Sequence, residues 1–310
     1  MNVTTLSIGR RGVSWWSRMA GFVQLTKPKI ALLELVTVAV AACVASGGIP
    51  SNWMLVLHAV IGTALVAASA SALNQWLERD SDARMERTEG RPLPAGLLSE
   101  REAFWFGAVT MVAGSIYLLL LVNQITALIG VVTWLLYVCV YTPLKSRSSA
   151  NTIVGAFAGA GPVLMGWTAV SPQWGTQEDI GLVVTLFLIV FFWQFPHFMA
   201  IAWIYREQYA KAGARMLTVV EPTGRLAGLQ AVSSAALLVP LSVLPAVMMK
   251  AGPVYFAIAL VLSATQLVFA IRFLVRPGDG SARSLLKMSL VYLPILFGLV
   301  WLSPIIFPWL

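Results

Sequence analysis

The sequence predicts an all-α integral membrane protein with nine transmembrane helices. Hydrophobic residues make up 58% of the 310 residues, charged residues make up only 11%, and the mean hydropathy is +0.81. These values exclude an ordinary soluble domain with a hydrated surface. Backbone amides in lipid must find hydrogen-bond partners within their own segment, and the two-residue alternation of a membrane β-barrel is absent, so we expect helices.

Nine windows of the sequence contain almost no charge, and each is close to the ~20 residues that a helix needs to cross the hydrocarbon. The length leaves no room for a separate soluble domain. We therefore expect residues 27–310 to form one transmembrane domain, preceded by a cytoplasmic amino-terminal arm at residues 1–26. The windows are 30–46, 53–73, 103–122, 125–141, 152–170, 180–203, 229–249, 254–273 and 286–307.

Lysine and arginine occur in the arm and in every second loop, and only Lys250 lies on the opposite side. Cytoplasmic loops carry this excess, so we expect a cytoplasmic amino terminus and an outside carboxyl terminus, in the inner membrane of a bacterium. The net charge of +8 follows from this bias together with attraction to anionic lipid, and gives no support to nucleic-acid binding. The basic residues on the cytoplasmic side are Arg10, Arg11, Arg18, Lys27, Lys29, Arg79, Arg84, Arg87, Arg91, Arg101, Lys145, Arg147, Arg206, Lys211, Arg215, Arg225, Arg272, Arg276, Arg283 and Lys287.

Three oxygen-bearing side chains follow one another at four-residue intervals at the end of the second span. A helix that continues past the hydrocarbon presents Asn74, Glu78 and Asp82 along one stripe. Mg²⁺ in proteins is usually held by one or two carboxylates, with substrate phosphates completing its coordination. We therefore predict that these three residues are catalytic and bind Mg²⁺ or, alternatively, Mn²⁺.

Basic side chains directly follow this stripe. Arg84, Arg87 and Arg91 carry planar, permanently charged guanidinium groups, which suit phosphate oxygens better than lysine does. Lys145 and Arg147, after the fourth span, lie on the same side of the membrane. We predict that these five residues bind a diphosphate, whose hydrocarbon tail lies in the apolar bundle.

An ordinary hydrated loop, with charges that pair among themselves, is the alternative explanation of this segment. Asn74 argues against it, because the residue lies just inside an apolar span, at the helical phase of the carboxylates, where a lone amide is costly. The alanines and serines of residues 67–72 also allow a neighbouring helix to approach closely. Both observations favour a cavity lined by the stripe.

A second charged loop follows the sixth span, four spans after the first and on the same face. This spacing predicts a bundle of two four-helix halves plus a ninth helix, with an active-site mouth on the cytoplasmic face. Glu207 is the best candidate in this loop for a second ligand to metal or bridging water.

Three isolated polar residues lie within the spans. His197 has Gln194 three residues before it and a neighbouring Pro196 that loosens the backbone, so we expect it to contact a substrate. His58 has no polar residue at helical spacing and is expected to pack. Glu34 is costly enough in the first span to be expected at the cavity, although the sequence assigns it no step.

The stripe, with the string at residues 85–93, resembles the first acidic motif of the UbiA family of intramembrane prenyltransferases. Nine spans with charged loops after the second and sixth are similar to that family over nearly the whole chain. Residues 80–88, residues 141–151 with 155–167 behind them, and residues 193–197 resemble its protoheme farnesyltransferase branch. The last string is the most discriminating, because relatives with aromatic acceptors usually lack its histidine context.

The resemblance implies transfer of a farnesyl group from farnesyl diphosphate to a vinyl group of haem B, which gives haem O and diphosphate. It implies haem binding by His197, and a haem A synthase or terminal oxidase assembly as downstream partner. Two positions depart from the family. Gln208 stands where an aspartate is common, which leaves the acidic role to Glu207, and Ser146 stands where an arginine is common, which leaves Arg147 as the substitute.

Three other functions are alternatives to farnesyl transfer. A UbiA-type enzyme with an aromatic or quinone-precursor acceptor shares the metal and diphosphate residues, and differs chiefly around His197. A secondary transporter for an anion would place its charged site near the midplane on broken helices, whereas these carboxylates lie at helix ends. A structural or assembly subunit would not need Asn74, Glu78 and Asp82 in phase.

Overall fold

The computed structural model describes residues 14–249 and 252–306, and within this part of the chain it is entirely helical, without strands. Nine of the described helices or helix pairs are long and apolar enough to cross a membrane, which confirms the predicted fold class. Arg10, Arg11 and Lys250, which entered the prediction of orientation, lie outside the described residues. The elements are α1 (Trp15–Leu25), α2 (Pro28–Ala45), α3 (Trp53–Asp82), α4 (Glu100–Leu121), α5 (Gln124–Leu135), η1 (Leu136–Tyr141), α6 (Thr142–Leu144), α7 (Asn151–Val170), α8 (Gln177–Ile204), α9 (Arg206–Lys211), α10 (Leu217–Val220), α11 (Arg225–Met248), α12 (Gly252–Val275) and α13 (Asp279–Ile306).

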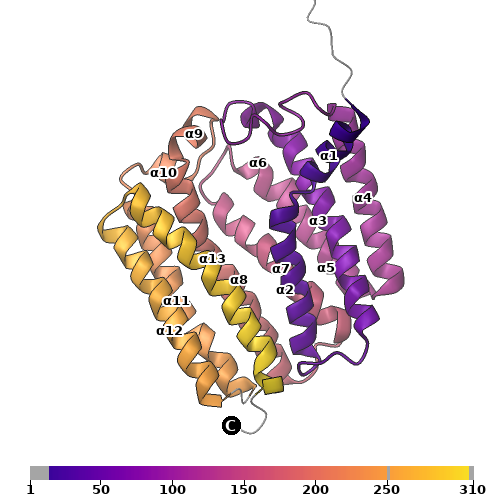
Figure 1. The fold of residues 1–310 in the computed structure, drawn as a ribbon, viewed down its shortest axis with the longest axis vertical. Helices are drawn as coiled ribbons and strands as arrows, with labels where there is room; N and C mark the ends of the chain where they lie inside the picture. Colours follow the sequence, from indigo (N-terminus) through magenta and orange to yellow (C-terminus); the bar gives the residue numbers. More distant parts are fainter. Residues whose placement is uncertain (1–13, 250–251, 307–310) are drawn as a thin grey trace, which may run out of the picture.

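The spans form a closed bundle. The first half, α2 to α5, packs on the second half, α7, α8, α11 and α12, chiefly through α2 and α7, and α13 lies against α8, α12 and α2. Figure 1 shows α1, α6 and α9 at one end of this bundle, while the α2–α3 connection and the described end of α13 lie at the other. All segments that carry predicted site residues outside the spans therefore meet at one end.

Close helix contacts depend on glycine in the middle of the bundle. A Cβ atom on Gly166 of α7 would lie 2.2 Å from the backbone oxygen of Val38 in α2, so only glycine allows these two helices their present separation. Trp167 beside it is 1% exposed and belongs to the largest apolar cluster, which also contains residues of α8, α11 and α13. This contact joins the two halves at the depth of the core.

Two helices extend farther than the others beyond the charge-free windows that predicted them. α3 continues from the predicted end near residue 73 to Asp82, and α13 begins at Asp279 rather than at residue 286. Each extension carries charged residues on regular helical turns past the apolar part of the span. The stripe of Asn74, Glu78 and Asp82 forms only because α3 continues to Asp82.

The fourth span is not one regular α-helix, which its hydrophobicity did not predict. α5 passes into the π-helix η1, and the Thr142 hydroxyl then donates to the carbonyl oxygen of Tyr137 at 2.8 Å. The rings of Tyr137 and Tyr141 lie 5.1 Å apart, and both side chains line the central cavity. π-Helical turns often occur at functional sites, because they change the direction of a side chain within a helix.

The described part of the amino-terminal arm packs on the bundle. Leu25 of α1 is buried in a cluster with Ala72 and Leu98, and the Gln75 side-chain amide of α3 donates to the Leu25 carbonyl at 2.9 Å. α2 begins only three residues later, at Pro28. The docking of α1 on α3 therefore fixes the position of the short link between α1 and α2.

Candidate active site

A cavity of about 450 Å³ lies inside the bundle and reaches the end that carries α1, α6 and α9. Its walls come from α2, α3, the fourth span, α7, α8 and α13, so both halves of the fold contribute. The deeper walls carry aromatic and aliphatic side chains, including Trp134, Tyr137 and Trp193. Four cations line the other end, and we call them the basic mouth: Lys27, Lys29, Arg87 and Lys145.

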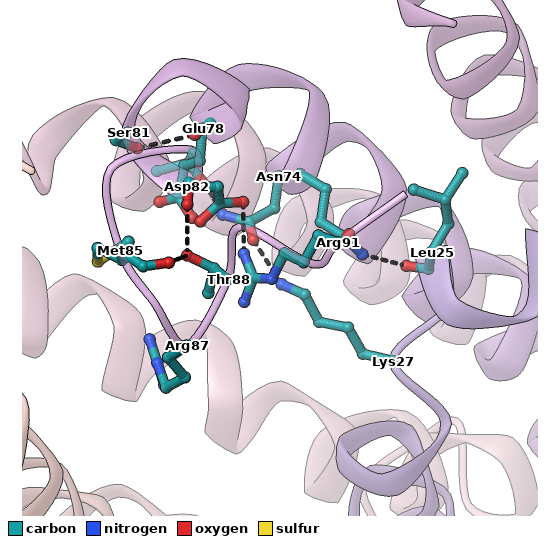
Figure 2. Close-up of polar contacts among 12 residues, drawn as sticks. Leu25, Lys27, Asn74, Glu78, Ser81, Asp82, Met85, Arg87, Thr88 and Arg91 are labelled. Carbon is teal, nitrogen blue, oxygen red and sulfur yellow. Dashed lines mark hydrogen bonds and ion pairs between the residues drawn. The ribbon is translucent and has the colours of Figure 1, made fainter. Parts of the chain in front are cut away.

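The predicted stripe of oxygen ligands lies on the last turns of α3, beside the basic mouth (Figure 2). Asn74 is fully buried, Asp82 is 1% exposed, and the Glu78 side chain is 15% exposed. Burial of two carboxylates is costly unless each is paired or hydrogen-bonded. The structure therefore brings the three residues together, and their surroundings must supply compensating cations.

Each residue of the stripe is contacted by one cation from a different segment. Lys145 Nζ lies 2.7 Å from Glu78 Oε1, and Arg91 Nη1 lies 2.6 Å from Asp82 Oδ2. Lys27 Nζ donates to Asn74 Oδ1 at 2.5 Å. Figure 2 shows the Arg91 and Lys27 side chains converging on the stripe. The site is thus built by the α1–α2 link, the α3–α4 loop and the turn after α6.

The donor set fits a divalent cation that a substrate helps to hold. Asp82 Oδ1 is buried and has no hydrogen-bond partner among the described residues, so one carboxylate oxygen is left over. Within the same part of the chain, no three Asp, Glu, His or Cys side chains cluster closely enough to hold a metal alone. Two carboxylates with phosphate oxygens are what Mg²⁺ usually accepts.

Arg87 joins the first charged loop to the second. Its guanidinium group lies over the ring of Tyr205 at 4.7 Å and donates to the Tyr209 hydroxyl at 3.3 Å. Its backbone N–H donates to Gln208 Oε1 at 3.2 Å. Gln208 and Tyr209 of the second loop therefore hold Arg87 of the first.

Three predicted residues are not brought into this site. Glu207 is 81% exposed and its nearest ion-pair partner is Arg206, at 3.9 Å, so the prediction that it is a second metal ligand finds no support in the geometry. Neighbouring Gln208 takes the inward-facing position instead. Arg84 and Arg147 are exposed and do not line the cavity, whereas Arg87 and Lys145 do line it.

The environment of the mouth changes the pKa values of two lysines. The pKa of Lys27 is lowered from its ordinary 10.5 to about 7, chiefly by burial and also by the nearby charges of Arg91 and Lys145, against the attraction of Glu78. Burial alone would also lower the pKa of Lys145, but the Glu78 carboxylate in contact with it reverses the effect and raises that pKa. Lys145 is therefore always charged, whereas Lys27 titrates near neutral pH.

His197 of α8 lines the cavity deeper than the mouth. Its ring stacks on Trp193, with centroids 5.0 Å apart, and its Nδ1 lies 2.9 Å from the Ser289 hydroxyl of α13. That hydroxyl donates its only hydrogen to the Leu286 carbonyl at 2.7 Å, so it must accept from Nδ1–H. In the neutral ring, Nε2 then keeps a free lone pair.

The sequence did not predict that Lys27 and Ser289 belong to the site. Lys27 lies in the left-handed region, with φ of 49°, which is uncommon for a residue with a side chain and marks a sharp change of direction before α2. The Lys-Pro pair, with proline at the first position of a helix, was the available signal. Ser289 had none, because its role depends on the packing of α13 against α8.

Comparison with known proteins identifies the family of this chain. A family model described as the UbiA prenyltransferase family matches residues 35–303. A relative in Koribacter versatilis named protoheme IX farnesyltransferase is 39% identical, over 96% of this chain and 97% of that protein. A relative of the same name in Rhodopirellula baltica is 41% identical, over 88% of this chain and 96% of its own.

Solved structures support the same fold. A chain described in work on digeranylgeranylglyceryl phosphate synthase superposes with a TM-score of 0.77 and 18% identity, covering 93% of this chain and 99% of that one. A UbiA homologue from Archaeoglobus fulgidus bound to DMAPP and Mg²⁺ gives a TM-score of 0.67 and 16% identity, covering 92% and 99%. With the family model and the relatives in agreement over nearly its whole length, this chain belongs to the UbiA prenyltransferase family.

Proposed function

We propose that this protein transfers the farnesyl group of farnesyl diphosphate to a vinyl group of haem B, with addition of water, to give haem O and diphosphate. The observation that carries the proposal is a single cavity that connects the basic mouth at one end with His197 deeper in the bundle. Such a cavity offers a charged site for a diphosphate at one end and a histidine ligand for a substrate with a metal centre deeper inside. The shared name of the relatives, protoheme IX farnesyltransferase, supports haem as the acceptor.

Glu78 and Asp82, with Asn74 beside them, would hold the divalent cation. The A. fulgidus homologue bound to DMAPP and Mg²⁺ supports a metal-bound diphosphate in this fold, and we propose Mg²⁺ in preference to Mn²⁺. A bound Mg²⁺ would stabilise the negative charge that develops on the departing diphosphate. The cations that now contact the stripe, Lys27, Arg91 and Lys145, together with Arg87, would contact the diphosphate oxygens.

The walls of the cavity suit an allylic cation. As the bond between farnesyl C1 and the diphosphate oxygen breaks, both electrons leave with the diphosphate, and the positive charge lies below the mouth. Trp134, Tyr137 and Trp193 line this region, and aromatic faces attract cations. The apolar walls also exclude bulk water that would capture the cation before the haem vinyl group attacks it.

His197 would bind the haem through its iron. The hydrogen bond from Nδ1–H to Ser289 leaves Nε2 as the coordinating atom, and a hydrogen bond at the far nitrogen is the usual support of a metal-bound histidine. The stacking of His197 on Trp193 holds the ring plane. Iron coordination would fix the vinyl group relative to farnesyl C1, which is the orientation that the reaction needs.

We further propose that the protein lies in the inner membrane of a bacterium, with the mouth and the amino terminus in the cytoplasm. The gathering of lysine and arginine at the mouth end of the bundle supports this orientation. Farnesyl diphosphate would then enter from the cytoplasm. Haem O would pass to a haem A synthase or to the assembly of a terminal oxidase.

The test is a reaction of the full chain, purified in detergent, with haem B, farnesyl diphosphate and Mg²⁺, followed by mass spectrometry of the haem. We expect haem O, no product after addition of a chelator, and a large loss in Asp82→Asn. Prenylation of an aromatic acid, with haem B left unchanged, would contradict the haem assignment and support the aromatic-acceptor alternative. Full activity of Asp82→Asn would contradict the metal site.

A further inference from the structure

Glu34 is the acidic side chain of the cavity that the proposed diphosphate site does not use. It lies on α2 and is the only Asp or Glu among the described residues that line the cavity. It makes no hydrogen bond and no ion pair with any described residue. A carboxylate in an apolar wall is costly when it has no partner, so its retention there calls for a function.

Glu34 lies below the basic mouth, on the path between the diphosphate site and the interior. It follows Lys27 by seven residues, which corresponds to about 10 Å along a helix at 1.5 Å per residue. Farnesyl C1 is attached directly to the diphosphate and must lie within a few ångströms of the mouth. Glu34, which lines the cavity at this depth, therefore lies near the place where C1 and the haem vinyl group would meet.

A second polar group lies at the same depth. Val38 of α2 and Ala59 of α3 pack in one cluster, and these helices are antiparallel. Four residues towards the mouth on each helix are Glu34 and Thr63, which therefore lie at a similar level, one turn nearer the mouth than that cluster. Thr63 also lines the cavity, is 3% exposed, and its hydroxyl has no partner among the described residues.

These two groups suit a single ordered water molecule. A buried water needs two to four polar partners, and the cavity offers a carboxylate and an unpartnered hydroxyl at one level. Thr37, one turn deeper on α2, adds a hydroxyl oxygen whose hydrogen is already donated to the Leu33 carbonyl at 2.9 Å. The surrounding wall is apolar, so water would be held at this position and kept away from the rest of the cavity.

We propose that Glu34 is the general base that takes a proton from the water captured during the reaction. This inference rests on the proposed function. When the terminal vinyl carbon of haem bonds to farnesyl C1, the positive charge passes to the inner vinyl carbon. The water oxygen bonds to that carbon, and one water proton moves to the Glu34 carboxylate, from which it returns to solvent as the product leaves. Without Glu34 to hold and deprotonate the water, the cation instead loses a proton from the newly alkylated carbon to the released diphosphate and gives an alkene.

No other group in the cavity serves this step equally well. The Nε2 atom of His197 is assigned to the haem iron. The lysines of the basic mouth face the diphosphate, and Glu78 and Asp82 are each contacted by a cation. Tyrosine and threonine hydroxyls are much weaker bases than a carboxylate at neutral pH. Glu34 combines basicity, access to the cavity and freedom from other contacts.

The test measures the partition of farnesylated haem between alcohol and alkene in Glu34→Gln, which changes the side-chain size very little. We expect the ratio of alcohol to alkene, read from products that differ by one water, to fall by about 100-fold, at the lower end of the range for a lost general base. The matched control is Glu178→Gln, the same change at an exposed position in the first turn of α8, which should leave the ratio unchanged. Glu34→Asp, which keeps the carboxylate, should restore most of the alcohol.

Two outcomes would overturn the proposal. One is an unchanged ratio in Glu34→Gln, and the other is an equal loss of both products with normal haem binding and thermal stability. If the glutamine variant does not fold, the ratio in Glu34→Asp decides, since a shorter carboxylate should give a measurable share of alkene. Failure of the proposed function is distinguishable, because the unaltered protein would then give no farnesylated haem of either kind.

Discussion

The Lys145 ammonium group lies 2.7 Å from the Glu78 carboxylate, and this contact joins the turn after α6 to the end of α3. The two side chains are 24% and 15% exposed, so the pair is shielded from water by the mouth of the cavity. Proximity to Glu78 holds the pKa of Lys145 above its ordinary value, so the pair does not titrate in the physiological range. Glu78 is therefore ionised and oriented before any substrate arrives.

Replacement of Glu78 by glutamine should abolish most of the prenyl transfer. The amide keeps the shape of the side chain but removes one of two carboxylates available to the metal. We expect kcat/KM for farnesyl diphosphate to fall by about 100- to 1,000-fold, as for other groups that stabilise developing charge. Steady-state assays over a range of Mg²⁺ concentrations measure the effect. Glu89→Gln, at an exposed position of the α3–α4 loop, is the control. A comparable loss of activity in this variant would contradict a specific role for Glu78.

The arginines of the α3–α4 loop should differ sharply in importance. Arg91→Ala and Arg87→Ala remove groups at the site, and each should raise KM for farnesyl diphosphate by about 10-fold or more, as expected for a lost charge-assisted hydrogen bond. Arg84→Ala removes an exposed side chain and should behave like the unaltered protein. Steady-state kinetics of the three variants measure KM for farnesyl diphosphate. Equal effects at all three positions would favour a general attraction of the basic loop.

Lys27 should take up a proton when diphosphate binds at alkaline pH. Its pKa is lowered to about 7 in the free site, so the amine is mostly neutral at pH 8.5, whereas a bound anion stabilises the ammonium form. Calorimetric titration with farnesyl diphosphate in two buffers of different ionisation enthalpy measures the uptake. Lys27→Met should remove that contribution, and an identical proton count in this variant would refute the assignment.

The lowered pKa of Lys27 also predicts how the free energy of unfolding changes with pH. Between pH 7 and 10.5 the unfolded chain carries a proton on Lys27 that the folded chain lacks, so this residue makes the free energy of unfolding rise with pH in that window. Below pH 7 both states carry the proton and the contribution is constant. Thermal unfolding of the metal-free protein in detergent, compared with Lys27→Met, should show the difference in slope.

Ser289→Ala should weaken haem binding without removal of His197. The alanine leaves Nδ1–H without an acceptor, so the imidazole loses its fixed tautomer and orientation. Loss of the hydrogen bond that orients a metal-bound histidine typically costs 10- to 100-fold in metal affinity, and we expect about 10-fold for haem B. Absorption and resonance Raman spectra of the bound haem should also shift. Ser284→Ala, at a partly buried position of the same helix, is the control, and an unchanged iron–histidine signal in Ser289→Ala would contradict the prediction.

A pair of glycine variants tests the packing of the two halves. Gly166→Ala places a Cβ atom against the Val38 backbone oxygen, which cannot move aside as a side chain can, so we expect a loss of about 1–3 kcal/mol. A Cβ atom on Gly298 of α13 would meet no atom within 4 Å. Gly298→Ala should therefore stabilise that helix by about 0.5–1 kcal/mol. Thermal denaturation in detergent should therefore show opposite shifts. A stabilising effect of Gly166→Ala would mean that α2 and α7 can separate easily.

The sequence predicted those features that depend on short-range periodicity. Charge-free windows located the spans, and the four-residue spacing of Asn74, Glu78 and Asp82 predicted their common stripe, because both follow from the geometry of one helix. Glu207 and Gln208 show where this approach fails. A step of one residue rotates a side chain by about 100° around a helix axis, and the phase of the six-residue helix α9 depends on its contacts with the α3–α4 loop.

The pairing of the site's charges depends on tertiary structure in the same way. Lys27, Arg91 and Lys145 come from three segments, and no local pattern tells which one reaches which oxygen of α3. The basic residues beside the stripe predicted a diphosphate site, but they did not indicate that Lys27, Arg91 and Lys145 contact the stripe itself.

These three contacts have a consequence for how the site is filled and emptied. Lys145 and Arg91 each cancel one carboxylate, so the two carboxylates offer little net attraction to a free divalent ion. The complex of a divalent ion with a diphosphate, by contrast, can replace both contacts at once, with cation to carboxylate and phosphate to ammonium or guanidinium. We therefore expect metal and substrate to enter as one unit. When the magnesium diphosphate departs, the original partners rejoin, and the enzyme returns to its starting state without an outside component.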